Sequence, residues 1–273
     1  MALVIRVSGS TSHELCKVYE HNLFKLPPAA TSRSVAKMLS FWSRNQMCGR
    51  FTLRRADKLK FDRVNTYDFW RSPARYNIAP TQPIWTVLDR AGERELTLLQ
   101  WGLIPSWSDK PAGIINARSE SIDEKASFKE SFQRRRCLIP ADGFYEWEKL
   151  GKATQPHFFQ MKDSSPFSFA GIWDEWKTEG NRISSCAIVT TAANSLLATI
   201  HHRMPVILTR EAESDWLNEE ATTDDLRMLM APFDAAKMKS SPVTNRVNNA
   251  DNDDEALVDP IEHGQELVQR LLF

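Results

Sequence analysis

The most informative stretch for the fold runs from Arg136 to Trp173 and reads RCLIPADGFYEWEKLGKATQPHFFQMKDSSPFSFAGIW. Short apolar runs alternate here with turn-forming segments such as Leu150-Gly151-Lys152 and Asp163 to Pro166. A further apolar run, from Ile183 to Thr191, continues the pattern. Such spacing is typical of antiparallel strands that follow one another in a β-meander.

The pattern extends on both sides of this stretch. Upstream, Ile84–Leu88 and Leu96–Trp101 predict a hairpin whose turn spans Asp89–Gly92. Downstream, Pro205–Leu208 predicts another strand. Helices are predicted at Thr52–Val64, Ile122–Phe132, Asn194–Ile200, Arg210–Asn218 and Thr223–Met230. We therefore expect one α+β domain built on antiparallel strands.

Composition limits the classes of function. The 273 residues contain 35 Lys and Arg against 35 Asp and Glu, so the formal net charge is zero. This balance argues against a protein that coats nucleic acid or anionic membrane through global charge, and any polyanion site must be local. No apolar run approaches the roughly 18 residues that a membrane span needs. We expect a soluble protein with no membrane partner.

The four cysteines are Cys16, Cys48, Cys137 and Cys186, and no two of them form a CxxC pair. This spacing indicates neither a structural metal site nor a disulfide scaffold, and it fits a reducing, cytoplasmic setting. The apolar run Ala2–Val7 lacks the basic region and the cleavage pattern of a signal peptide. We expect no metal and no cofactor.

The chain divides into three parts. Residues 1–46 contain Ser and Thr clusters and little sustained periodicity, and we interpret them as an N-terminal extension. Residues 47–255 are predicted to form the domain that carries the chemistry, and residues 256–273 a C-terminal tail.

Four short segments place one reactive or polar side chain among aromatic or apolar neighbours. They are Met47-Cys48-Gly49-Arg50-Phe51, Ile115-Asn116-Ala117-Arg118-Ser119-Glu120, Gly143-Phe144-Tyr145-Glu146-Trp147 and His201-His202-Arg203-Met204-Pro205. Each segment alone is weak evidence, because a Cys is commonly buried as a small hydrophobe and a strand Glu usually points outward.

Together with the motifs at Tyr76–Thr81, Trp101–Trp107 and Arg136–Pro140, these segments resemble the SOS response-associated peptidase family, the abasic-site processing proteins. The resemblance runs from Met47 to the low 250s. It implies a mainly antiparallel, barrel-like β-sheet with flanking helices, and an active-site set of Cys48, Asn116, Glu146 and His201. It also implies that Cys48 becomes the mature N-terminus and crosslinks to an abasic site in single-stranded DNA.

The chemistry of an N-terminal cysteine agrees with this implication. Such a residue offers an α-amine with a pKa of about 7.7–8.0 and a thiol with a pKa of about 8.5 on adjacent carbons. The amine can form a Schiff base with the aldehyde of an opened abasic sugar, and the thiol can then close a thiazolidine. An internal Cys48 has lost the amine to a peptide bond, so the start of the chain decides whether this reaction is possible.

Three further residues can support the reaction. Glu146 is placed between aromatics, where desolvation raises a carboxyl pKa toward neutrality and suits proton transfer. His201 is a natural acid or base for opening the sugar ring or reversing the crosslink. Asn116 can orient the amine or the sugar oxygen.

Neighbouring residues compete for these roles. His202 is the rival of His201, and Glu148 is predicted on the same strand face as Glu146. We interpret His157 as a strand residue and Glu120 as a structural acid that pairs with a nearby Arg.

DNA contact requires a local basic surface. The segment Arg50–Arg63 is rich in Lys and Arg, whereas Glu211–Asp225 and Asp251–Glu255 are acidic. The basic stretch next to Cys48 can act as a phosphate track, although a solvated helix face is the alternative. The DNA-binding residues expected from this pattern and from the motifs are Arg50, Pro80, Trp101, Trp107, Arg118 and Arg203.

Three functions remain open at this level. The first is a protein that links covalently to abasic sites in single strands and thereby shields them. The second is a thiol peptidase, or autopeptidase, with Cys48 as nucleophile, His201 as base and Asn116 as orienter. The third is a DNA-binding module in which the cysteine is incidental. We expect a monomer located in the cytoplasm, and at the nucleoid if the source is bacterial.

The start of the chain is also open. Translation can begin at Met47, residues 1–46 can be a propeptide that is removed by self-cleavage, or they can be a retained extension that disables the aminothiol. The Met47-Cys48 junction favours the first explanation, because initiator methionine is removed before small residues.

Overall fold

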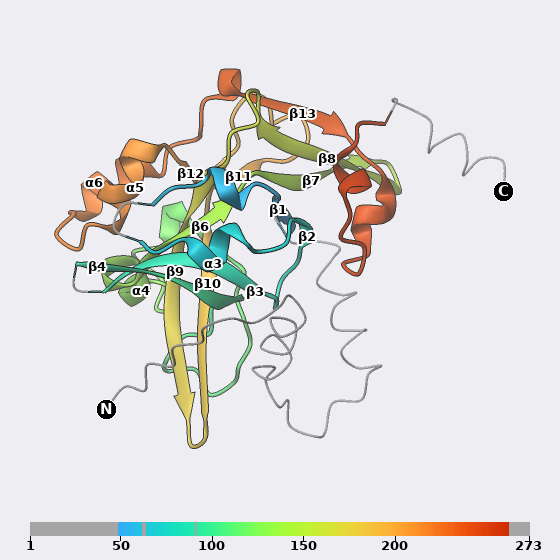
Figure 1. Ribbon diagram of the computed structural model, residues 1–273. Helices are drawn as coiled ribbons and strands as arrows, with labels where there is room; N and C mark the ends of the chain where they lie inside the picture. The colour runs from blue at the N-terminus through green and yellow to red at the C-terminus, as the bar shows by residue number, and fades with distance from the viewer. Residues whose placement is uncertain (1–48, 62–63, 91, 262–273) are drawn as a thin grey trace. The chain divides into compact units, whose positions relative to one another are not determined.

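Five strands close into a β-barrel in the computed structural model, which describes residues 49–61, 64–90 and 92–261 (Figure 1). The barrel strands are β3 (Pro83–Arg90), β4 (Glu93–Trp101), β6 (Arg136–Ala141), β9 (Phe167–Thr178) and β10 (Asn181–Ala192). They pair in the order β10-β4-β3-β6-β9, and the pairing of β9 with β10 closes the ring. All of these pairs are antiparallel except β4 with β10.

Two hairpins of the barrel follow from local turn chemistry. Between β3 and β4, Gly92 has a φ of +84°, and its N–H donates to the Asp89 carboxylate at 2.8 Å. Between β9 and β10, Gly180 has a φ of +87°. Glycine takes these left-handed conformations without steric cost. The β9–β10 hairpin is the long pair of strands that projects from the barrel in Figure 1.

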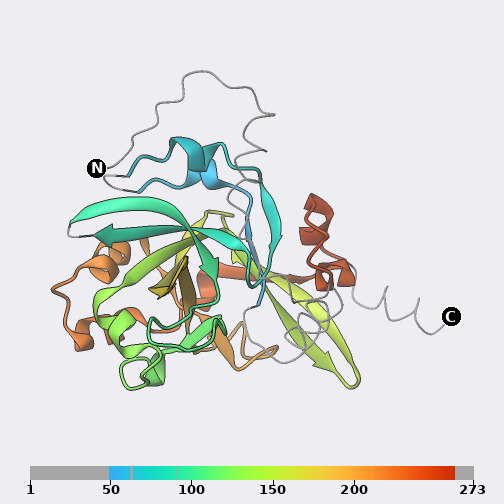
Figure 2. The ribbon, with the colours of Figure 1, turned by 90° about the horizontal axis from the view of Figure 1, so that it is seen from below.

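A second antiparallel sheet packs beside the barrel (Figure 2). Its order is β13-β8-β7-β1-β2, and its strands are β1 (Phe51–Leu53), β2 (Arg75–Ile78), β7 (Gly143–Leu150), β8 (Ala153–Met161) and β13 (Met238–Pro242). The chain passes from the barrel into this sheet between β6 and β7. The motif around Glu146 therefore begins where the two sheets meet.

Short elements complete the described part of the chain. The strands β5 (Asn116–Arg118) and β11 (Arg203–Pro205) pair with β10, and β12 (Ile207–Leu208) pairs with β9. The α-helices are α3 (Tyr67–Trp70), α4 (Lys129–Arg134), α5 (Arg210–Leu217) and α6 (Thr223–Leu229). The 3-10 helices are η1 (Ala56–Lys58), η2 (Ser119–Ser121), η3 (Ala235–Lys237), η4 (Asn245–Asn248) and η5 (Glu255–Val258).

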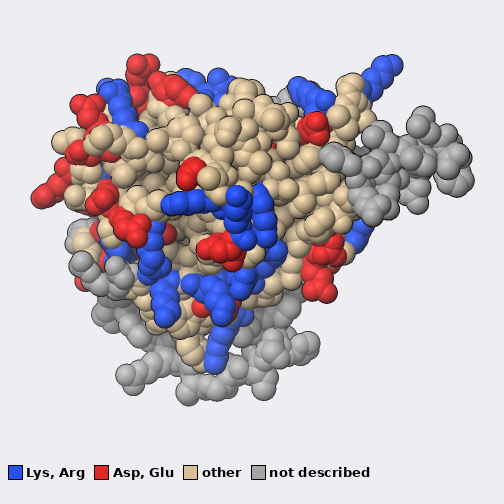
Figure 3. All heavy atoms as spheres, turned by 90° about the horizontal axis from the view of Figure 1, so that it is seen from above, with Lys and Arg blue, Asp and Glu red and all other residues tan. Residues whose placement is uncertain are grey.

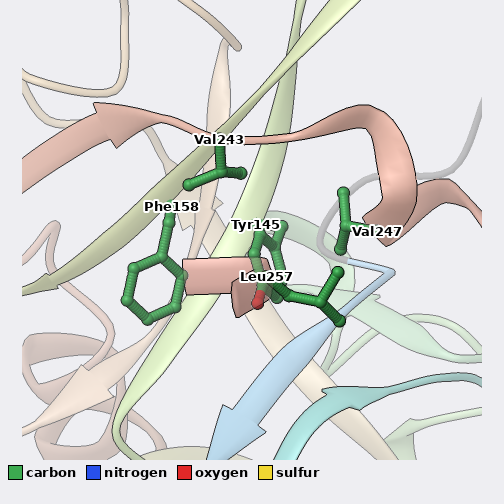
Figure 4. Close-up of a cluster of buried hydrophobic side chains, with 5 residues drawn as sticks. All are labelled: Tyr145, Phe158, Val243, Val247 and Leu257. Carbon is green, nitrogen blue, oxygen red and sulfur yellow. The ribbon is translucent and has the colours of Figure 1, made fainter. Parts of the chain in front are cut away.

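The second sheet has its own apolar cluster, formed by Tyr145, Phe158, Val243, Val247 and Leu257 (Figure 4). All five side chains are fully buried, and Leu257 belongs to η5. The packed core therefore extends past residue 255, where the sequence placed the start of a tail.

The expected fold class, an α+β domain of mainly antiparallel, barrel-like sheet, is confirmed. The predicted 84–101 hairpin and the strands of the β-meander form, and the two helices predicted between residues 210 and 230 appear as α5 and α6. The predicted 122–132 helix is wrong in extent, because only α4, from residue 129, is α-helical there. Residues 194–200 form turns rather than a helix.

The helix predicted from Thr52 to Val64 is wrong. Thr52 lies in β1, and its hydroxyl donates to the buried carboxylate of Asp142 at 2.5 Å. The same carboxylate accepts the backbone N–H groups of Arg54 and Arg55, at 2.5 and 2.8 Å. Because these bonds hold the backbone in a turn after β1, the segment cannot continue as a helix.

Candidate active site

Glu146 is held on β7 with its side chain out of solvent. The residue is 2 % exposed, and its register partner across the β7–β8 pair is His157. Side chains of directly opposite residues lie on the same face of an antiparallel pair. The fold therefore presents a carboxyl and an imidazole side by side at a buried position, an arrangement suited to proton transfer.

The first described residues of the domain run beside the same strand. The backbone oxygen of Arg50 accepts a hydrogen bond from the backbone N–H of Tyr145 at 3.0 Å. Arg50 thus lies next to the residue that precedes Glu146. Cys48, the predicted nucleophile, lies outside the described residues.

The Arg50 side chain is half-buried and is held by polar groups of the protein. Its guanidinium donates to the Asn77 side-chain oxygen at 2.9 Å and to the backbone oxygens of Val247 and Asn248, at 2.5 and 3.2 Å. Burial lowers the pKa of Arg50 below its usual value. The residue predicted as a phosphate contact is therefore used to anchor the start of the domain to η4.

Asn116 lies on β5, half-buried, with Ile188 of β10 as its register partner. The preceding residue is fixed by Trp101, whose indole N–H donates to the Ile115 backbone oxygen at 3.0 Å. The Trp101 ring in turn packs edge-on against Phe51 of β1, with centroids 5.2 Å apart. These contacts connect the strand that carries Asn116 to the start of the domain.

His201 lies just before β11 and is half-buried. Its ring is tilted by 33° against that of the exposed His202, with centroids 4.4 Å apart. Burial, above all, lowers the pKa of His201 below its usual value of 6.5, whereas the hydrogen bond with the Arg203 backbone raises it. The charges of His202, Lys149 and Arg203 lower the pKa of His201 further. Lys149 lies near the end of β7, so this part of the strand acts electrostatically on His201. The difference in burial favours His201 over His202 as the residue whose titration the protein controls.

Arg203 joins the Asn116 and His201 segments. It is buried, and its guanidinium donates to Glu120 Oε1 at 2.5 Å and to the Thr190 backbone oxygen at 2.6 Å. The hydrogen bond from Arg203 is the main cause of a lowered Glu120 pKa. The structural pairing expected of Glu120 thus has Arg203 as its partner, and the same contacts occupy the guanidinium that the sequence assigned to DNA.

The other predicted DNA-binding residues differ in access. Trp101 is 0 % exposed and belongs to the core, so its ring cannot stack on a base. Trp107 is 59 % exposed, on a loop whose Ser106 N–H donates to Asp174 at 2.8 Å. Arg118 is exposed on β5, and Pro80 is half-buried in the turn after β2. Trp107 and Arg118 are therefore the exposed members of the predicted DNA-binding set, and Pro80, like Arg50, is half-buried.

Charge is unevenly distributed over the surface in Figure 3. Lys and Arg side chains gather across the middle of this face, and Asp and Glu side chains are concentrated toward the side where α5 and α6 lie. The first turns of these helices carry Glu211, Glu213, Asp224 and Asp225. On this face acidic side chains are most numerous near α5 and α6, and others lie among the basic ones.

One pair of site residues escaped the sequence interpretation. His157, taken for a strand residue, places its Nε2 atom 3.0 Å from Glu148 Oε2. The signal that could have revealed the pair is the alternation of Glu146 and Glu148 on one strand together with a His on the next. Without the β7–β8 register, nothing in the sequence shows which of these side chains meet.

Two further properties concern the described residues alone. Within them, no group of three or more His, Cys, Asp or Glu side chains is arranged to hold a metal ion. In that same part of the chain, no helix is long and apolar enough to cross a membrane.

The fold and site define a class of β-barrel proteins with known structures. A crystal structure from Bacteroides thetaiotaomicron superimposes with a TM-score of 0.67 at 27% sequence identity, covering 78% of this chain and 100% of that one. Residues 47–250 match the family described as SOS response associated peptidase (SRAP). The chain belongs to this family.

Similar proteins carry the name abasic site processing protein. YoqW of Bacillus subtilis (strain 168) is 41% identical over 222 residues, which cover 78% of this chain and 99% of YoqW. YedK of Escherichia coli (strain K12) is 33% identical over 225 residues, covering 79% and 100%. HMCES of Xenopus tropicalis is 34% identical over 190 residues, covering 59% and 56%.

Proposed function

We propose that this protein processes abasic sites in single-stranded DNA by forming a covalent thiazolidine through Cys48, once the residues before Cys48 are absent. The observation that carries the proposal is the hydrogen bond between Arg50 and Tyr145, beside the buried Glu146. Cys48 precedes Arg50 by only two residues. Family membership and the names of the relatives support the same conclusion.

The reaction divides into two bond-forming steps. The α-amine of Cys48 attacks the aldehyde carbon of the opened sugar and gives a carbinolamine, which loses water to become an imine. The thiol sulfur then adds to the imine carbon, and its proton passes to the nitrogen. One water molecule is released in total, and no oxidant or reductant is needed.

Glu146 has the position to move the protons of these steps. As an acid it protonates the departing hydroxyl of the carbinolamine, and as a base it accepts the thiol proton during ring closure. Asn116 offers both an amide donor and an acceptor, with which it orients the amine or the sugar oxygen. His201 removes the hemiacetal proton when the sugar ring opens and returns a proton on reversal.

Single strands suit the accessible DNA-binding residues. A DNA base can stack on the exposed Trp107 ring. Arg118, which lies on the same β-strand as Asn116, can contact a DNA phosphate. Affinity is expected to fall steeply as salt rises, because bound Lys and Arg side chains displace counterions.

A second candidate, a thiol peptidase or autopeptidase, is suggested by the description of the family. It would use an internal Cys48 as nucleophile, with His201 as base. An autoproteolytic cut before Cys48 would create the aminothiol, so the two activities can share one site. Peptide turnover with Cys48 internal would favour this candidate, whereas the crosslink is a single stoichiometric event.

The experiment compares wild-type protein with Cys48→Ala and Cys48→Ser on a single-stranded oligonucleotide that carries one abasic site. Denaturing electrophoresis after heating should show a stable adduct for the wild type and none for either variant. Ala lacks the thiol, and Ser closes the ring far less readily. A heat-stable adduct at wild-type yield in Cys48→Ala would exclude the thiazolidine.

A further inference from the structure

The surroundings of Glu146 contain a second titratable pair. His157 is the register partner of Glu146, and Glu148 lies two residues further along β7. Because side chains alternate along a strand, all three lie on one face of the β7–β8 pair. Cβ atoms of directly opposite residues are about 4.5–5.5 Å apart, which places the His157 ring within reach of both carboxyl groups.

The contact with Glu148 determines the protonation state of one of the two ring nitrogens of His157. His157 Nε2 lies 3.0 Å from Glu148 Oε2, and an ionised carboxylate only accepts hydrogen bonds. The Nε2 atom therefore carries a proton and donates a hydrogen bond to the Glu148 carboxylate. The His157 side chain is 8 % exposed and that of Glu148 is 30 % exposed, so one end of the pair is buried beside Glu146 and the other reaches solvent.

Two further elements, β13 and η4, contact β8, the strand that carries His157. On β13, the register partner of His157 is Pro242. On η4, Arg246 pairs with Asp254 at 2.6 Å. Strand alternation places two titratable residues of β7, Glu146 and Glu148, on the His157 face of the β7–β8 pair.

We propose that His157, held by Glu148, is a positioning residue that sets the proton affinity of the Glu146 carboxyl and so the pH range of adduct formation. A protonated imidazole next to Glu146 stabilises the carboxylate form, because opposite charges a few ångströms apart favour ionisation. The negative charge of Glu148, next to Nε2, favours the imidazolium form, in which Nδ1 carries a second proton. The inference rests on the proposed function, in which Glu146 transfers protons.

The test measures the rate of adduct formation against pH for His157→Gln, which keeps a hydrogen-bond donor but cannot carry the charge. Without the cation, Glu146 holds its proton to higher pH. The limb on which the rate falls with rising pH should therefore move upward. Glu148→Gln, at a partly exposed position, should move the limb in the same direction by a smaller amount. Lys152→Gln, at the exposed tip of the same hairpin, is the matched control and should leave the profile unchanged.

Two results separate this inference from the proposed function. If Glu146→Gln slows adduct formation while both His157→Gln and Glu148→Gln keep the wild-type pH profile, His157 is merely structural and the inference is overturned. If Glu146→Gln itself forms adduct at the wild-type rate, the acid role in the proposed function fails. Thermal unfolding of each variant is measured alongside, and Glu148→Gln serves as the test if His157→Gln does not fold.

Discussion

At Glu146, a single substitution can remove the acidic group and keep nearly the same side-chain volume. Gln has nearly the same size but cannot donate a carboxyl proton, so Glu146→Gln should slow adduct formation by about 10²- to 10⁴-fold, the usual contribution of general acid–base catalysis. The folded structure should persist, which a thermal unfolding curve can verify. Glu95→Gln, at an exposed position on β4, is the control. An unchanged rate in Glu146→Gln would show that the buried carboxyl is structural.

The proposed role of His201 predicts a separate pH dependence of the rate of adduct formation. Burial lowers its pKa below 6.5, so the neutral imidazole, which acts as a base, persists to lower pH than in an exposed histidine. The part of the rate that His201→Gln abolishes should therefore be fully present at neutral pH and lost only as the pH falls through values below 6.5. The pH–rate profiles of both proteins measure this part. If the His201-dependent part of the rate were already lost above pH 6.5, the role assigned to the neutral imidazole would be contradicted.

At the scale of elements, β1 depends on a single buried carboxylate. Asp142 accepts the Thr52 hydroxyl, two backbone N–H groups and Arg54 Nε, the last at 3.0 Å. Asp142→Ala should lower the free energy of unfolding by about 3 kcal/mol, because these donors are left without their charged acceptor. Adduct formation should also fall, since β1 fixes the chain from Phe51, three residues after Cys48.

The control for this prediction is Asp163→Ala, in the exposed turn after β8, where chemical denaturation should detect little change. Equal stability of the Asp142 variant and the wild type would mean that the turn after β1 is held by other contacts.

The loop that carries Trp107 is expected to act as a stacking platform. Trp107→Ala should weaken binding to intact single-stranded DNA by about 1–3 kcal/mol, the range for one stacked base. Trp70→Ala, on α3, removes another exposed tryptophan and is the matched control in a fluorescence titration. Equal losses for the two variants would indicate that Trp107 has no specific place in the DNA site.

The elements also show what the sequence can and cannot predict. The β3–β4 hairpin and the β-meander were predictable because their turns carry Gly and Asp at the positions that the backbone conformation requires. The helix over residues 52–64 was wrong because its competitor, Asp142, is distant in sequence. Trp101 and Arg203 stand in recognisable motifs, yet only the fold shows that their side chains are buried.

At the scale of the whole molecule, a chain with no net charge has an uneven distribution of basic and acidic side chains on the face in Figure 3. A neutral protein of this kind can bind DNA through a local surface without general attraction to polyanions. The family domain accounts for residues 47–250, and the chemistry proposed for it depends on what precedes Cys48. In the proposed chemistry, the presence or absence of residues 1–47 decides whether Cys48 has a free α-amine.

Intact mass spectrometry of the protein, before and after incubation with a single-stranded oligonucleotide carrying one abasic site, tests the central claim most directly. N-terminal sequencing of the same sample identifies the first residue. We predict a chain that begins at Cys48, lighter than the full sequence by the mass of residues 1–47, and a single adduct whose mass is that of protein plus oligonucleotide less one water. A heat-stable adduct on a chain that still begins at Met1 or Ala2 would contradict the account.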